Sequence, residues 1–480
     1  MKDYSRFYGS LALLIILNVL IKPLWIFGID RQVQNVVGTA AYGAYFSLFN
    51  FSIVLSFLLD WGLTAYYNRQ LATGKENFTN KAGNFLFIKL FFAVIYTIVI
   101  LSVAWLSGIR RWDILWYVIF IQVFTSLFIF FRSIITAQQW FRTDAWLSVL
   151  DKTLMIVICG SFLIIPSAFG TMTVERFLQV QATCTGLAML SAAGIVLRRG
   201  ISFSVFNNSV LDFKILKPAL PFAIIVLLMS VHYRLDGFLL ERLHPNGDYE
   251  AGLYAGAYRL LDAANMIGFL VASFLLPFLA RQWSGKSNID EVVLISRNLL
   301  IIFSLFISST TIFLAPWIQQ LLYHNDNAAA IAVLQYCLPA LIGYSLVQVY
   351  GTVMTATGHI IQFCYIVLSS VVLNVTLNLL LIPDHGAKGS CMAALISQGY
   401  CGAATLVYCR QKLKIPVQFR SLVVYVLLGA LLCGFFYFCR SVTFSKWIVV
   451  VGAGVICLVV VMAARLFNLA KWKTIFRSNI

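Results

Sequence analysis

The sequence predicts an all-α protein of about fourteen membrane-spanning helices, because it combines an apolar composition, repeated long apolar stretches and basic residues gathered between them. Of the 480 residues, 61% are hydrophobic and only 11% are charged, which an ordinary soluble domain does not show. A helix needs about 20 apolar residues to cross a bilayer. We expect spans near 10–29, 42–65, 84–106, 114–137, 145–165, 175–197, 217–239, 251–279, 293–314, 329–352, 360–382, 389–409, 421–439 and 446–466.

The first stretch contains Lys22 and Pro23 and continues to Trp25 without a small-residue cleavage site, so we expect a retained span. All 10 cysteines lie within predicted spans and suggest neither a disulfide framework nor a metal cluster. We also find no glycine-rich phosphate-binding loop in the sequence, and no His, Cys and Asp residues at the spacing of a zinc site or of a catalytic nucleophile. The sequence therefore predicts no catalytic residues, no metal and no cofactor.

The Lys and Arg residues of the connections set the predicted orientation, because cytoplasmic loops retain positive charge. With the N-terminus inside, roughly 21 of them, including Arg297, lie on the inner side against roughly 8 outside. The outer group is Arg31, Arg110, Arg111, Arg176, Arg242, Lys388, Arg440 and Lys446. Both termini are predicted to be cytoplasmic. The net charge of +17 follows mostly from this topology and does not indicate nucleic-acid binding.

Basic side chains inside the predicted spans are the main functional signal. They are Lys22, Lys89, Arg132, Lys152, Arg234 and Arg259. A charge at mid-membrane costs at least ~2.5 to 3.5 kcal/mol on insertion scales, so such residues usually face a bundle interior or a water-filled cavity. A cationic cavity predicts an anionic passenger.

Each of these cations has a structural alternative. Lys22 could bind the backbone carbonyl that Pro23 leaves free in a kinked helix. Lys89 could extend to the cytoplasmic interface, and it is left out of the predicted site. Acidic neighbours that could neutralise the others are Asp262 for Arg259, Asp236 for Arg234 and Asp151 for Lys152.

A weak internal repeat divides the chain. At an offset of 209 residues, Ala41-Tyr42-Gly43-Ala44-Tyr45 aligns with Glu250-Ala251-Gly252-Leu253-Tyr254, and the first span aligns with the seventh. Repeated helix bundles of this kind build many secondary transporters. The predicted domains are an N-terminal lobe (1–199), a cytoplasmic linker (200–216), a C-terminal lobe (217–412) and two further helices with a basic tail (413–480).

At these residues the chain resembles the Wzx-type flippases of lipid-linked oligosaccharides and polysaccharides, within the MOP exporter superfamily. The segments that carry the resemblance, in order, are 42–45 (Tyr-Gly-Ala-Tyr), 59–63 (Leu-Asp-Trp-Gly-Leu), 251–254 (Ala-Gly-Leu-Tyr), 257–260 (Ala-Tyr-Arg-Leu) and 381–390. The resemblance covers nearly the whole chain. It implies two six-helix lobes in a V around a central cavity, with two added C-terminal helices, in the bacterial inner membrane.

The resemblance also implies a passenger, an undecaprenyl-pyrophosphate-linked oligosaccharide moved from the cytoplasmic to the outer face. A diphosphate needs cations in a low-dielectric interior, and Arg can bind phosphate oxygens in a bidentate manner. We therefore expect Lys22, Arg234 and Arg259 to clamp the diphosphate, with Arg132 and Lys152 extending the basic surface. Tyr45, Tyr254 and Tyr258 could stack on sugar rings.

The energy source and the partners stay open at this stage. Acidic residues within spans, Asp60, Asp236 and Asp262, are candidates for coupling to a proton or sodium gradient, although Asp60 can instead cap the turn before Gly62. We expect a monomer that meets membrane lipid and glycan-assembly enzymes such as a polymerase. The alternatives are a lipid II-type flippase, a drug or cation antiporter of the same superfamily, and a membrane glycan polymerase or ligase.

Overall fold

The computed structural model describes residues 13–14, 16–72, 82–201, 203, 216–284, 288–324, 327–440 and 445–464, and every regular element in these ranges is a helix. The predicted all-α class is confirmed. Most of the predicted linker 200–216, the tail 465–480 and the start of the first span lie outside the described residues.

Twelve helices in the described part are long and apolar enough to cross a membrane. One of them, α15 (Ile360–Lys412), contains both predicted spans 360–382 and 389–409, with non-helical backbone at Gly386 between them. The predicted first span is only partly described, and its residues 16–23 are helical. These two facts account for the difference from the predicted number of about fourteen.

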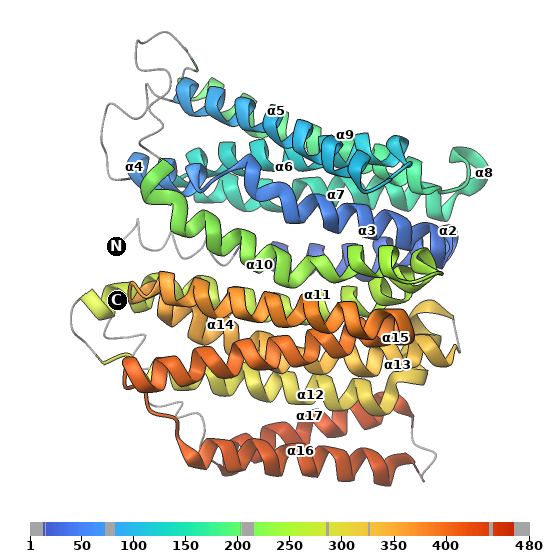
Figure 1. The fold of residues 1–480 in the computed structure, drawn as a ribbon, viewed down its shortest axis with the longest axis vertical. Coiled ribbons are helices and arrows are strands. Elements are labelled where there is room, and N and C mark those ends of the chain that lie inside the picture. The colour runs from blue at the N-terminus through green and yellow to red at the C-terminus, as the bar shows by residue number, and fades with distance from the viewer. Residues whose placement is uncertain are drawn as a thin grey trace. The chain divides into compact units, whose positions relative to one another are not determined.

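The chain separates by contacts into two compact units, Met1–Gly252 and Leu253–Ile480. The elements of the first unit after the helix at 16–23 are η1 (Leu24–Asp30), α2 (Arg31–Val37), α3 (Thr39–Leu55), η2 (Ser56–Leu59), α4 (Leu63–Ala72), α5 (Ala82–Leu106), α6 (Trp112–Ala137), α7 (Phe141–Ile164), α8 (Pro166–Phe169), α9 (Val174–Arg198) and α10 (Leu216–Leu243) (Figure 1).

Within this unit α6 and α7 both pack against α9, and α10 packs along α3. Phe51 of α3 and Phe238 of α10 stack with their ring centroids 4.8 Å apart. The unit therefore includes the helix that the internal repeat assigns to the second lobe. The lobe boundaries 1–199 and 217–412 stay a prediction.

The second unit begins within α11 (Gly247–Ser284), whose first residues belong to the first unit. Its further elements are α12 (Asp290–Tyr323), α13 (Ala328–Cys337), η5 (Leu338–Ala340), α14 (Leu341–Ala356), α15, α16 (Phe419–Arg440) and α17 (Lys446–Ala463). Helix α12 contacts α14, α16 and α17. The two C-terminal helices pack on α12 through an apolar cluster in which Phe313 and Phe436 stack at 5.5 Å.

Three local breaks follow from the sequence. After Pro23 the first helix continues as the π-helix η1, because proline lacks the N–H that the regular ladder needs. The predicted span 42–65 is interrupted after η2, where Trp61 and Gly62 have positive φ angles of 45° and 76°. The connection between the predicted spans 360–382 and 389–409 bends at Gly386, whose φ of 52° is one that glycine adopts readily.

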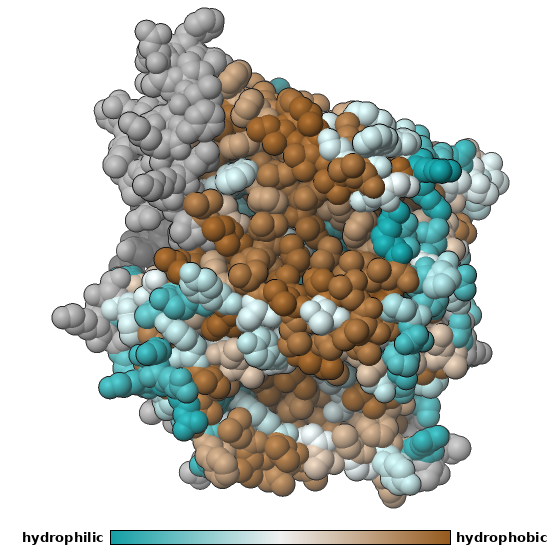
Figure 2. All heavy atoms as spheres, in the orientation of Figure 1, coloured by the Kyte–Doolittle hydropathy of each residue, from teal (hydrophilic) through white to brown (hydrophobic). Residues whose placement is uncertain are grey.

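The surface agrees with a membrane location. On the face shown in Figure 2, hydrophobic side chains cover the middle lengths of the helices, and hydrophilic side chains gather toward the helix ends. Exposed apolar residues lie mid-helix in both units, for example Ile98 of α5 and Val426 of α16. Because a lipid-facing surface needs no polar groups, the prediction of a multi-pass membrane protein is confirmed.

Candidate functional site: a basic polar group in the first unit

Three of the predicted cations lie together in the first unit. The charges that act on Lys22 are those of Asp151, Arg132 and Lys152, which come from α6 and α7. With Asp144, which pairs with Arg132, these residues are called here the basic polar group. Three basic and two acidic side chains give it a formal net charge of +1.

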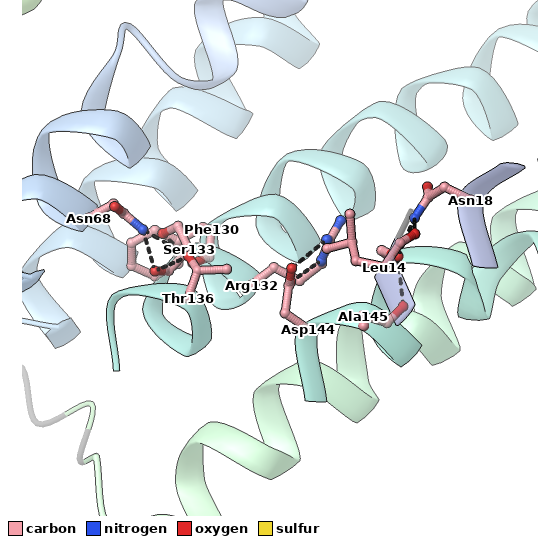
Figure 3. A network of polar contacts seen from close by, with 10 residues as sticks. Leu14, Asn18, Asn68, Phe130, Arg132, Ser133, Thr136, Asp144 and Ala145 are labelled. Carbon is pink, nitrogen blue, oxygen red and sulfur yellow. Dashed lines mark hydrogen bonds and ion pairs between the residues drawn. The ribbon is translucent and has the colours of Figure 1, made fainter. Parts of the chain in front are cut away.

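Arg132 makes the strongest contact of the group. Its Nε donates to Oδ1 of Asp144 at 2.7 Å and its Nη2 donates to Oδ2 at 3.1 Å (Figure 3). Asp144 lies in the first turn of α7 and is only 4% exposed. A bidentate pair of this kind fixes the guanidinium in one orientation, so this charge holds α6 against α7.

Lys152 is held between a carboxylate and an aromatic ring. Its Nζ lies 3.2 Å from Oδ2 of Asp151 and 5.2 Å from the ring centroid of Trp25. Trp25 in turn stacks on Phe177 of α9 with ring centroids 5.9 Å apart. The position of this ammonium therefore depends on η1 and α7 together.

Lys22 differs from the other two. Within the part of the chain that the structure describes, its ammonium forms no ion pair, and the side chain is half-buried. Its helix is fixed to α7 by Asn18, whose Nδ2 donates to Ser148 Oγ and to the Leu14 carbonyl, both at 2.8 Å (Figure 3). Lys22 is therefore the basic side chain of this group that has no carboxylate partner in the described residues.

The other two predicted ligands lie elsewhere. Arg234 is half-buried on α10 of the first unit, two residues before the buried Asp236. Arg259 lies on α11 in the second unit, on the same helix as Asp262, and both are half-buried. The clamp of Lys22, Arg234 and Arg259, and any coupling role for Asp236 or Asp262, stay predictions.

The tyrosines predicted to stack on sugars are buried within their units. Tyr45 packs edge-on against Phe177 at 5.5 Å and its hydroxyl donates to Gln181 at 3.4 Å. Tyr254 and Tyr258 stack on each other at 5.4 Å. Their predicted role with sugars is not tested by these contacts.

Lys89 is not placed as the sequence analysis expected. The alternative in which its side chain extends to the interface does not fit, because the residue is 2% exposed. Its Nζ forms an ion pair with Asp60 and donates to Thr64 Oγ1 at 3.0 Å. The pair joins α5 to the break in the second span. The sequence shows opposite charges in neighbouring spans but does not show that they meet.

Arg297 is a second buried cation. It was grouped with the cytoplasmic loop charges, yet it is 1% exposed on α12. Its guanidinium donates to the hydroxyls of Tyr425 at 3.2 Å and Tyr350 at 3.4 Å, and to Oδ1 of Asn298 at 3.2 Å. Its position inside the predicted span 293–314 was the signal that could have identified it.

Paired and unpaired charges held between membrane-spanning helices are the pattern expected of a helical membrane transporter. The chain belongs to the family described as Polysaccharide biosynthesis protein, which it matches over residues 9–283, more than half its length. No curated protein matches the sequence.

Solved structures give the same fold. The chain is similar to the lipid II flippase MurJ in an inward closed conformation, with a TM-score of 0.63, 13% identity and coverage of 96% of this chain and 98% of that one. It is similar to a multidrug resistance MATE transporter of the MOP superfamily in an inward-facing conformation, with a TM-score of 0.64, 16% identity and coverage of 85% and 98%.

A MATE transporter from Vibrio cholerae, VcmN, is also similar, with a TM-score of 0.59, 15% identity and coverage of 86% and 98%. At these identities the likeness shows the fold alone. The family match and the shared fold bear out the predicted resemblance.

Proposed function

We propose that the protein flips undecaprenyl-pyrophosphate-linked oligosaccharides from the cytoplasmic to the outer face of the bacterial inner membrane. The family match and the likeness to a lipid II flippase support a lipid-linked sugar as passenger. The observation that carries the proposal is the net positive basic polar group, in which Lys22 forms no ion pair within the described residues.

The chemistry of this group suits a diphosphate. Arg132 and Lys152 are held by Asp144 and Asp151, so their positions are set before any passenger arrives. The ammonium of Lys22 is then the movable charge that meets the phosphate oxygens, since lysine acts as a point charge with three donors. Arg234 and Arg259 complete the proposed clamp, and the lobes alternate access by rocking about it.

Two alternatives share the fold. A lipid II-type flippase differs only in the head group that its cavity accepts, and the likeness to MurJ supports it as the second candidate. A drug or cation antiporter is supported by the MATE likeness alone. The net formal charge of +1 of the basic polar group disfavours a cationic drug at this position. The same proposal includes coupling of transport to a proton or sodium gradient and a topology with both termini in the cytoplasm. It also includes a monomeric protein that works beside a glycan polymerase.

The test is transport of a fluorescent undecaprenyl-pyrophosphate oligosaccharide across proteoliposomes. We expect Lys22→Ala to slow transport by about tenfold or more, as loss of one charge-assisted hydrogen bond requires. Lys412→Ala is the matched control, because Lys412 is exposed at the end of α15. Equal transport rates in Lys22→Ala and Lys412→Ala would show that Lys22 does not bind the passenger. Export of cationic dyes without movement of the lipid would favour the antiporter.

A further inference from the structure

A pocket of about 730 Å³ opens in the first unit, at the end that carries α2 and α8 in Figure 1. The end of α2, the start of α3, the start of α6 and the segment before α9 form its wall. Pockets that bind small ligands have volumes of ~300 to 1,000 Å³. The pocket is separate from the basic polar group and shares no residue with it.

Two carboxylates face this pocket. Asp113 lies in the first turn of α6 and Glu175 in the first turn of α9. Within the described residues neither forms an ion pair, and both are exposed. A helix N-terminus favours an acidic residue by itself, but here the two N-termini bring both carboxylates to one cavity.

The basic residue of the wall is already paired. Nη2 of Arg111 lies 2.8 Å from Oδ2 of Asp248, a residue at the start of α11 that does not line the pocket. The carboxylates of Asp113 and Glu175 therefore dominate the free charge of the cavity. A phosphate or another anion would be repelled there.

The rest of the lining is apolar or carries hydroxyls. Ile114 and Met172 are buried and form apolar wall, and Thr171 adds a hydroxyl. No group of three or more metal-binding side chains is found in the described part of the chain, so the two carboxylates do not constitute a metal site. Carboxylates that accept hydrogen bonds beside an apolar wall suit a ligand with many hydroxyls on an apolar ring, which is a sugar.

We propose that this pocket binds a neutral oligosaccharide, the sugar part of the passenger, a proposal that rests on the proposed function. Asp113 and Glu175 accept hydrogen bonds from sugar hydroxyls, and the exposed side chain of Val36 contacts the C–H faces of the rings. The connection before α6 belongs to the predicted outer side. The pocket then holds the sugar at the outer face while the diphosphate occupies the basic polar group.

Direct binding tests the pocket independently of transport. The purified protein in nanodiscs is dialysed against two lipid-free neutral probes, maltotetraose and tetra-N-acetylchitotetraose. We expect wild type to bind at least one probe. Thr171→Trp, which fills the pocket, and the double variant Asp113→Asn with Glu175→Gln should weaken that binding by about tenfold or more, the loss expected for charge-assisted hydrogen bonds.

Thr376→Trp is the matched control, because Thr376 is exposed on α15 and its hydroxyl bonds only within its own helix. The control should bind like wild type. If neither probe binds wild type, or if the pocket variants bind as wild type does, the pocket is not a sugar site.

Transport then links the pocket to the passenger. Wild type and variants are compared on undecaprenyl-pyrophosphate that carries either one sugar or the tetrasaccharide that binds. We expect the pocket variants to slow only the tetrasaccharide lipid, and equal slowing of both lipids would overturn the proposal. Binding of the free sugar with no movement of either lipid by wild type would instead refute the proposed function and leave the pocket assignment standing.

Discussion

Gly43 of α3 and Gly252 of α11, which the internal repeat aligns at its offset of 209 residues, meet in the first unit. A Cβ built on Gly43 would overlap the carbonyl oxygen of Asp248 and would lie 2.9 Å from the Cα of Gly252. A Cβ built on Gly252 would overlap the Thr39 carbonyl oxygen. Two backbones that approach so closely leave no room for a side chain, so both repeats require glycine here.

Gly43→Ala is therefore expected to force α3 away from the first turn of α11. Overpacking of this kind costs about 1 to 3 kcal/mol, and thermal unfolding in detergent should begin at a lower temperature. The ion pair of Arg111 with Asp248 and the hydrogen bond from Gln34 Nε2 to the Gly252 carbonyl, at 2.9 Å, should weaken with it. Gly194→Ala is the control, because no atom lies within 4 Å of its added Cβ. Equal stability of the two variants would contradict the close approach.

Arg132 and Lys22 should respond differently to substitution. Asp144→Asn leaves a partly buried guanidinium without its carboxylate and is expected to cost about 2 to 3 kcal/mol, less than for a fully buried pair, because the Arg132 side chain is 25% exposed. Lys22→Ala breaks no ion pair among the described residues, so its melting temperature should stay close to that of wild type while its transport falls. Melting curves and transport rates measured on the same samples separate the two roles. A large loss of stability in Lys22→Ala would show that Lys22 stabilises the fold and would contradict its role in binding the passenger.

The helices could be predicted from the sequence, because long apolar runs between basic connections need only local information. The ion pair of Arg132 with Asp144 could not be predicted from the sequence. Asp144 stands one residue before the predicted span 145–165 and was not considered among the intramembrane acids. The ion pair of Lys89 with Asp60 could not be predicted either, because Asp60 lies on another span. Which charges meet depends on how the spans pack, and hydropathy does not contain that information.

Lys89 and Asp60 should behave as one unit in a double-mutant cycle. Lys89→Met leaves the Asp60 carboxylate, which is 35% exposed, without its cation. Asp60→Asn leaves the almost fully buried ammonium without a carboxylate, with the Thr64 hydroxyl as its remaining partner. We expect each single variant to be destabilised, Asp60→Asn more strongly, by about 3 kcal/mol. The double variant should recover part of that loss, because neither charge is then left alone. Strictly additive effects would show that the pair does not interact.

The same cycle tests whether Asp60 couples transport to an ion gradient. If the carboxylate serves only to hold Lys89 at the break in the second span, the double variant should transport with the same dependence on an imposed proton or sodium gradient as wild type. Loss of that dependence in double-variant protein that remains folded would instead assign the coupling role to Asp60. Measuring uptake with and without each gradient in proteoliposomes distinguishes the two results.

Arg297 should fasten α16 to α12. Its guanidinium is almost completely buried and its partners in the described residues are hydroxyl and amide oxygens, of which Tyr425 belongs to α16. Tyr425→Phe removes one acceptor from a charged donor and is expected to cost about 1.5 to 3 kcal/mol, and it should make α16 more accessible to proteolysis. Tyr437→Phe on the same helix is the matched control, since Tyr437 is exposed. Because Tyr425 lies outside the basic polar group, Tyr425→Phe protein that remains folded should flip the lipid at the wild-type rate, and a selective loss of transport would show that α16 takes part in the transport cycle.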